Sequence, residues 1–142
     1  MAAALVLMAA SATAQEPPRV IVNTANPATQ IQRDALLAIY MGSMTIWRDG
    51  KPIAPVDHSM RSPVRAAFSD KVLGKPAMSV QIHWLRKVAA EHVNPPPTKP
   101  SDAEVVAYVR ANPGAIGYVA ADFTLDEAVK VVKVLSGGAG ER

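Results

Sequence analysis

The chain has 142 residues, of which 49% are hydrophobic and 19% are charged. This is the size and composition of one globular domain, and it excludes a disordered or collagen-like chain. Because cysteine is absent, disulfides, thiol nucleophiles and cysteine zinc sites are excluded as well. The net charge of +3 is spread along the chain and falls short of the basic patch that nucleic-acid binding requires, so we expect no nucleic-acid partner.

The first segment has the layout of a secretory signal peptide. An apolar core over 3–10 precedes Ala12-Thr13-Ala14, which is an A-x-A cleavage site, although no Lys or Arg stands before the core. Pro17-Pro18 ends the apolar run well short of the roughly 20 residues that a membrane span needs. We therefore expect a signal peptide over 1–14, removal of that segment and export to the periplasm. The alternative is a frayed apolar N-terminus on a cytosolic protein.

The first half of the remaining chain alternates apolar runs with a helical periodicity. A buried strand is expected over 19–23. The hydroxyl and glutamine of Thr29–Gln32 have the spacing of a capping box, which predicts a helix that continues to Gly42. A second strand is expected over 53–57, where Pro55 confines it to a sheet edge or a strand start.

Three further helices and two strands are expected in the second half. Ser62-Pro63 starts a helix well, because serine caps it and proline is tolerated at the first helical position. Asn94–Pro100 is a stiff extended connector, and Ser101–Glu104 is a second capping box. The remaining expected elements are a helix from 63 to 73, a helix from Ser79, a helix from 101 to 111, strands at 115–119 and 128–135, and a flexible Gly-rich tail over 136–142. Strands and helices mixed in this order predict a single small α/β domain over 15–135, with helices packed on a small mixed sheet.

The turn before the second helix is the most suggestive local feature. A strand end followed by a helix N-terminus presents backbone N–H groups and the positive end of the helix dipole, which favours anions. His58, Ser59, Arg61 and Ser62 stand in this turn and could converge on one anion. The structural alternative is that Ser62 only caps its helix and that the charged groups are solvated.

Other chemistries find little support in the sequence. His83 and His92 are nine residues apart and do not share the i, i+4 face of a helical metal pair, so we expect no metal and no cofactor. Asp57 and His58 are adjacent on a strand and point to opposite faces, which argues against a catalytic dyad. No nucleophile elbow and no phosphate loop are present, and we expect no enzyme.

A set of short motifs in this order resembles a known family. The motifs are Leu36-x-x-Ile39-Tyr40-Met41-Gly42, Thr45-x-Trp47-x-Asp49-Gly50, Pro55-Val56-Asp57, Ser62-Pro63-Val64-Arg65-x-x-Phe68, Val72-Leu73-Gly74, Trp84, Asp102-Ala103-Glu104-Val105 and Asn112-Pro113-Gly114-Ala115-Ile116-Gly117-Tyr118-Val119. The set resembles short periplasmic proteins related to the substrate-binding protein of phosphate ABC transporters. The resemblance covers about 20–119 and implies one lobe of a type II periplasmic-binding-protein fold.

This chain departs at two places from the proteins that it resembles. Their corresponding turn carries an Arg and an Asp before a Ser-Gly-Thr helix start, whereas here those places hold His58, Met60 and Ser62-Pro63-Val64. Full receptors close two lobes around phosphate, so a single lobe would hold it exposed. The short relatives carry a Phe-Thr-Gly-Arg-Gly-like stretch where this chain has 89–93, without either glycine.

Two functions remain open at this point. The first is a periplasmic solute-binding-like protein that binds phosphate or another small oxyanion at the helix start, with a transporter as partner. The second is a ligand-free envelope interaction module that keeps the fold and has lost the anion site. In that case Tyr40, Trp47 or the loop 95–97 would meet an envelope protein, because exposed aromatic residues often anchor interfaces.

Overall fold

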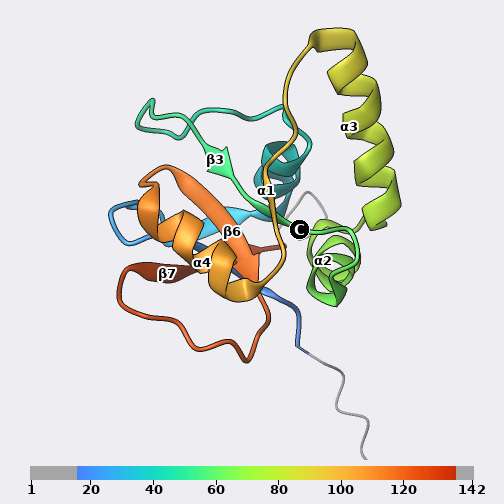
Figure 1. Cartoon of the computed structure of the whole chain (residues 1–142). Helices are drawn as coiled ribbons and strands as arrows, with labels where there is room; N and C mark the ends of the chain where they lie inside the picture. The colour runs from blue at the N-terminus through green and yellow to red at the C-terminus, as the bar shows by residue number, and fades with distance from the viewer. Residues whose placement is uncertain (1–15, 137–142) are drawn as a thin grey trace, which may run out of the picture.

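The computed structural model of the chain describes residues 16–136. The expected signal peptide and all but the first residue of the expected tail lie outside this range. The elements are β1 (Arg19–Asn23), β2 (Gln30–Gln32), α1 (Arg33–Tyr40), β3 (Ala54–Pro55), β4 (Asp57–His58), α2 (Pro63–Ala67), the π-helix η1 (Phe68–Leu73), α3 (Ala77–Glu91), β5 (Thr98–Lys99), α4 (Asp102–Ala111), β6 (Ala115–Val119) and β7 (Val129–Leu135). The predicted α/β domain with helices on a small mixed sheet is confirmed (Figure 1).

The main sheet has five strands in the order β2-β7-β1-β6-β3. β1 runs antiparallel to both β6 and β7, whereas the two edge strands, β2 and β3, run parallel to their neighbours. β4 and β5 form a separate parallel pair. Pro55 lies in the edge strand β3, as its missing N–H predicts.

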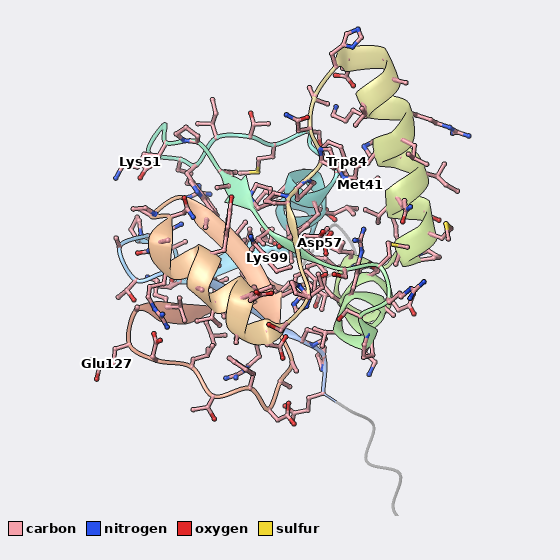
Figure 2. All side chains as sticks on the ribbon, viewed as in Figure 1. Met41, Lys51, Asp57, Trp84, Lys99 and Glu127 are labelled. Carbon is pink, nitrogen blue, oxygen red and sulfur yellow. The ribbon has the colours of Figure 1, made fainter. Side chains whose placement is uncertain are left out.

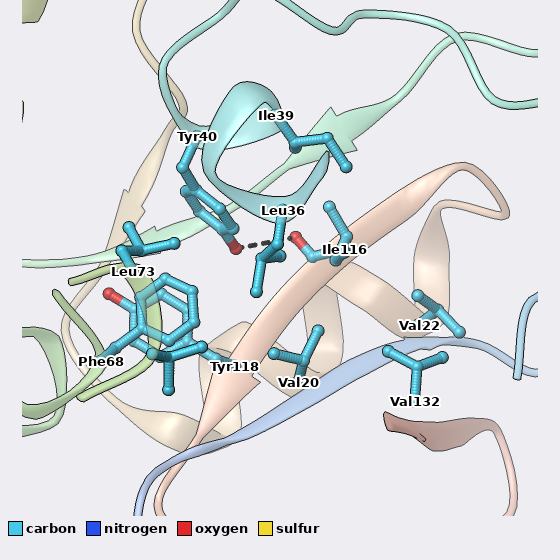
Figure 3. Packing of buried hydrophobic residues seen from close by; sticks show 11 residues of the cluster. Val20, Val22, Leu36, Ile39, Tyr40, Phe68, Leu73, Ile116, Tyr118 and Val132 are labelled. Carbon is cyan, nitrogen blue, oxygen red and sulfur yellow. Dashed lines mark hydrogen bonds between the residues drawn. The ribbon is translucent and has the colours of Figure 1, made fainter. Parts of the chain in front are cut away.

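Helices cover both faces of this sheet. In β6, Ile116 and Tyr118 face a core built with α1 and η1, while Ala115 and Val119 face a second core built with α4. All five residues of β6 are buried, which is typical of a central strand covered on both faces. Figure 3 shows the first of these cores, where Tyr40 and Leu36 of α1 lie over the sheet.

Two predictions in the first half are wrong in detail. The Thr29–Gln32 segment is no capping box: 30–32 form β2, and α1 begins at Arg33 without a side-chain cap. Pairing with β7 takes the segment into the sheet. The expected strand over 53–57 is split at Val56, where the chain leaves the main sheet and enters the small one.

The other strands and helices expected within 16–136 lie within two residues of the observed ones, although the last six residues of the helix expected over 63–73 form the π-helix η1. Ser62 Oγ accepts hydrogen bonds from the N–H groups of Val64 and Arg65, and Ser101 Oγ accepts one from Glu104. Gly74 has φ 74°, the left-handed conformation that ends a helix and favours glycine. Within residues 16–136, no helix is long and apolar enough to cross a membrane.

Gly117 permits the close approach of α4 to the sheet. A methyl group at this position would lie 2.8 Å from Val56 Cγ1, 2.9 Å from Val105 Cγ1 and 3.3 Å from Val109 Cγ2. We expect Gly117→Ala to overpack this layer and to lower the free energy of unfolding by about 1–3 kcal/mol. Urea denaturation followed by circular dichroism measures the change. A variant as stable as the parent chain would show that α4 can move away from the sheet without cost.

Candidate functional site

The turn over 58–62 connects β4 to α2 and contains all four residues predicted to bind an anion. It begins in the small sheet, where the N–H of Ser59 donates to the carbonyl of Lys99 over 3.1 Å. It closes on itself through the N–H of Ser62, which donates to the carbonyl of Ser59 over 2.9 Å. The turn is therefore fixed at both ends by backbone hydrogen bonds.

His58 lies inside the protein rather than at the surface of the turn. Its side chain is 1% exposed, and Nε2 lies 2.7 Å from the carbonyl oxygen of Tyr118. A carbonyl oxygen only accepts, so Nε2 carries the proton. Asp102 Oδ1, at the start of α4, lies 3.5 Å from the same nitrogen. The imidazole thus points toward β6 and α4.

Ser59, Arg61 and Ser62 occupy different positions on the turn. The hydroxyl of Ser59 donates to the carbonyl of Lys99 over 3.4 Å. Arg61 is exposed, and Ser62 is half-buried at the start of α2. The structure therefore leaves Arg61 and Ser62 on the outer rim, while His58 and Ser59 are engaged with the protein interior and the small sheet.

The N–H groups of the first turn of α2 are already bonded. Val64 and Arg65 donate to Ser62 Oγ over 3.2 and 3.4 Å, and Ala66 donates to the carbonyl of Ser62 over 3.2 Å. Pro63 has no N–H to offer. Ser62 Oγ accepts two hydrogen bonds here, so its own proton is directed elsewhere and can be donated to a ligand.

A buried ion pair lies behind the turn. Arg65 Nη2 lies 3.6 Å from Asp57 Oδ2, and both side chains are about one-tenth exposed. Arg65 Nη1 also donates to the carbonyl of His58 over 2.8 Å. The pair therefore ties α2 to β4 and fixes the path of the backbone at His58 (Figure 2 labels Asp57).

Tyr118 completes this buried cluster from the central strand β6. Its hydroxyl donates to Asp57 Oδ1, and its ring stacks on Phe68 at 3.7 Å between centroids. Burial is the main cause that raises the pKa of the Tyr118 phenol above its ordinary value, and the Asp57 carboxylate raises it further. Burial likewise raises the pKa of Tyr40, the neighbouring phenol.

The partners in this cluster could not be predicted from local sequence signals. Asp57 and Tyr118 are 61 residues apart, and no local periodicity joins them. The only signal was that Arg65 sits on the second helix three residues before Phe68, on the same face as that core residue.

The residues expected to support other functions have structural contacts. His83 Nε2 lies 2.7 Å from the carbonyl oxygen of Met41, and Trp84 Nε1 donates to that of Tyr40 over 2.8 Å. Tyr40 is 1% exposed, so it cannot serve as the surface anchor considered for an interaction module. Trp47 is half-buried, and its Nε1 donates to the carbonyl of Gly114.

Among the described residues, no group of three or more His, Asp or Glu side chains could hold a metal.

Comparison with known proteins identifies relatives of this fold. The profile of a family described as "PBP superfamily domain" matches residues 16–141. No curated protein sequence matches the chain.

Several solved structures have a similar fold. One is an ABC-type phosphate transport receptor from Vibrio cholerae, with 22% identity, a TM-score of 0.65 and coverage of 85% of this chain and 47% of that one. Another is a putative phosphate ABC transporter substrate-binding protein with bound phosphate from Clostridium perfringens, with 24% identity, a TM-score of 0.64 and coverage of 85% and 46%. PstS from Borrelia burgdorferi matches with 17% identity, a TM-score of 0.66 and coverage of 87% and 49%. The chain spans about half the length of these structures, and the expected likeness to one lobe is confirmed at the level of the fold.

The buried Tyr118 hydroxyl makes folding sensitive to high pH. Because its pKa is raised in the folded chain, only the unfolded chain ionises this phenol near its ordinary pKa of about 10. The stability that it contributes is therefore complete below pH 10 and is lost as the pH rises above it. We expect Tyr118→Phe to lower the free energy of unfolding by about 1–3 kcal/mol at pH 7, because Asp57 loses a donor.

Urea denaturation of both chains between pH 7 and pH 11 checks both parts of this expectation. The variant should lose less stability above pH 10 than the parent chain does. Equal losses in the two chains would contradict the assignment of the alkaline effect to Tyr118.

Proposed function

Since the chain belongs to the family of PBP superfamily domains, we propose that it is a solute-binding lobe that binds phosphate or another small oxyanion at the start of α2. The proposal places the anion on the outer rim of the turn over 58–62. On this proposal the protein is exported to the periplasm, works beside an envelope or transporter protein, and has no catalytic role. Two of the structures with a similar fold are a phosphate transport receptor and a putative phosphate-transporter substrate-binding protein with bound phosphate, and this supports the choice of ligand.

The observation that carries the proposal is the state of the Ser62 hydroxyl. Its oxygen accepts hydrogen bonds from the N–H groups of Val64 and Arg65. The hydroxyl can therefore still donate its own proton in a hydrogen bond to an anion. Arg61, the residue before it, is exposed and offers a planar guanidinium fork. The helix N-terminus adds a positive partial charge at the same place.

This geometry predicts weak binding. The first-turn N–H groups of α2 are already used, and the imidazole of His58 is buried. Ser59 donates to Lys99, so two donors remain, from Arg61 and Ser62. An anion held by two donors at an open surface keeps much of its contact with water, so we expect a dissociation constant in the millimolar range.

One observation favours the ligand-free interaction module as a second candidate. The backbone N–H groups of Ser59 and Ser62 and those of the first turn of α2 are bonded within the protein, as a lobe without a ligand would require. In that case the protein would use a different surface, because Tyr40 is buried.

Thermal unfolding in phosphate-free buffer separates the two candidates. Phosphate at 100 times its dissociation constant should stabilise the fold by about 2.7 kcal/mol, which raises the melting temperature by a few degrees. Arg61→Ala should remove the shift, because it removes the exposed cation of the turn. Arg86→Ala, a change of another exposed arginine on α3, is the matched control and should keep it.

Two results would reject the anion site. The first is a melting temperature that stays constant up to tens of millimolar phosphate. The second is a shift that survives in Arg61→Ala. A constant melting temperature would support the interaction module instead.

A further inference from the structure

Helix α3 is attached to the domain along one side only. Val80 is its one residue that is buried. The side chains of His83 and Trp84 contact the carbonyl oxygens of Met41 and Tyr40, at the end of α1. Figure 1 shows α3 at the edge of the domain, beside α2. The side of the helix that points away from these contacts is therefore open to the surroundings, and we call it the open face of α3.

The open face of α3 carries an apolar stripe. Its side chains recur at intervals of four, three and four residues, which is the spacing of one helical face, and they are Met78, Ile82, Leu85 and Ala89. The same periodicity places the stripe opposite the buried Val80. Leu85 is 65% exposed, Met78 58% and Ile82 42%. An amphipathic helix normally turns such a stripe toward the core, whereas here it faces outward.

The exposed apolar side chains of the protein are concentrated on this helix. In the part of the chain that the structure describes, seven large apolar side chains are exposed, and four of them belong to α3: Met78, Ile82, Leu85 and Val88. A fifth, Met60 of the turn, lines one groove together with Leu85 and Val88. Exposed apolar side chains that gather in one patch mark a surface that meets a protein or a membrane, whereas scattered ones need no explanation.

The charges beside the stripe are positive. Arg86 follows Ile82 by one helical turn and is exposed, and Lys75 is exposed just before the helix begins. Within residues 16–136, neither of these two cations forms an ion pair. Glu91, the acidic residue of α3, pairs with Lys87 over 3.0 Å. The open face of α3 is therefore both apolar and basic.

The sign of these charges selects among the possible occupants. A second copy of the chain would bring its own Lys75 and Arg86 to the same interface, and like charges repel. An anionic occupant gains from both cations instead. A single helix at the edge of a domain also presents a convex ridge, which an anionic lipid surface accommodates without a matching shape.

We propose that the open face of α3 docks on an anionic lipid surface. The helix lies in the plane of the interface, with Met78, Ile82 and Leu85 at the boundary of the acyl chains and with Lys75 and Arg86 at the headgroup phosphates. The stripe extends over about three helical turns, so the whole face engages the surface at once. This docking does not depend on phosphate binding at the turn over 58–62.

A fluorescent label on the stripe tests the proposal in the full chain. The chain has no cysteine, so Met78→Cys provides a single site for a nitrobenzoxadiazole label, whose fluorescence rises when it leaves water. We expect a saturable rise with vesicles of phosphatidylglycerol and phosphatidylcholine in equal parts. Vesicles of phosphatidylcholine alone should give little rise. Val131→Cys labels an exposed apolar position on β7, away from α3, and should give none (Figure 1).

Two pairs of variants in the labelled Met78→Cys chain separate the apolar and the charged contributions. Ile82→Asp places a charge in the stripe and should weaken binding to the anionic vesicles at least tenfold, whereas Ile46→Asp, at an exposed apolar position outside α3, should leave it unchanged. Arg86→Gln should weaken binding about fivefold, the share of one cation near an anionic surface. Arg48→Gln, at an exposed arginine before β3, is the matched control and should keep it.

Three results would overturn the proposal. The first is a label at position 78 that does not respond to the anionic vesicles or that responds equally to neutral ones. The second is undiminished binding in Ile82→Asp, which would place the lipid contact elsewhere in the chain. The third is a rise that needs no vesicles and grows with protein concentration, together with a dimer in analytical ultracentrifugation, which would assign the stripe to a second copy. Circular dichroism of each variant confirms that a loss of binding is not a loss of fold.

Discussion

The hydrogen bond from the Tyr118 hydroxyl to the Asp57 carboxylate is the contact on which the candidate site depends. Tyr118 belongs to the central strand, and its ring stacks on Phe68, so its position is fixed by the core. Asp57 begins the small sheet and pairs with Arg65 of α2. A carboxylate and a guanidinium this deeply buried are stable only as partners. The core therefore determines where the turn between them lies.

This arrangement explains why the turn has an inner and an outer side. Arg65 binds the carbonyl of His58, and the imidazole of His58 reaches the carbonyl of Tyr118, so the inner side is filled by the protein's own groups. The outer side keeps the Ser62 hydroxyl and Arg61. The same ion pair also lines a groove beside α3. One buried cluster thus fixes which groups of the turn face the interior and which face the outside.

Much of the fold could be predicted from the sequence, because its signals are local. The apolar runs of β1 and β6 and the Ser62-Pro63 helix start need no distant partner to be recognised. β2 was missed because its short segment, Gln30–Gln32, becomes a strand only through pairing with β7. The candidate site was predictable as a segment but not as a geometry: whether His58 faces in or out depends on Tyr118, 60 residues away.

The most direct test of this account follows His58 and the turn by nuclear magnetic resonance during a phosphate titration. The ring signals of His58 should stay constant, because the imidazole is buried and bonded to Tyr118. The amide signals of Arg61 and Ser62 should move together and saturate. Movement of the His58 ring signals with the same midpoint would contradict the account, since it would place the imidazole on the anion and outside the buried cluster.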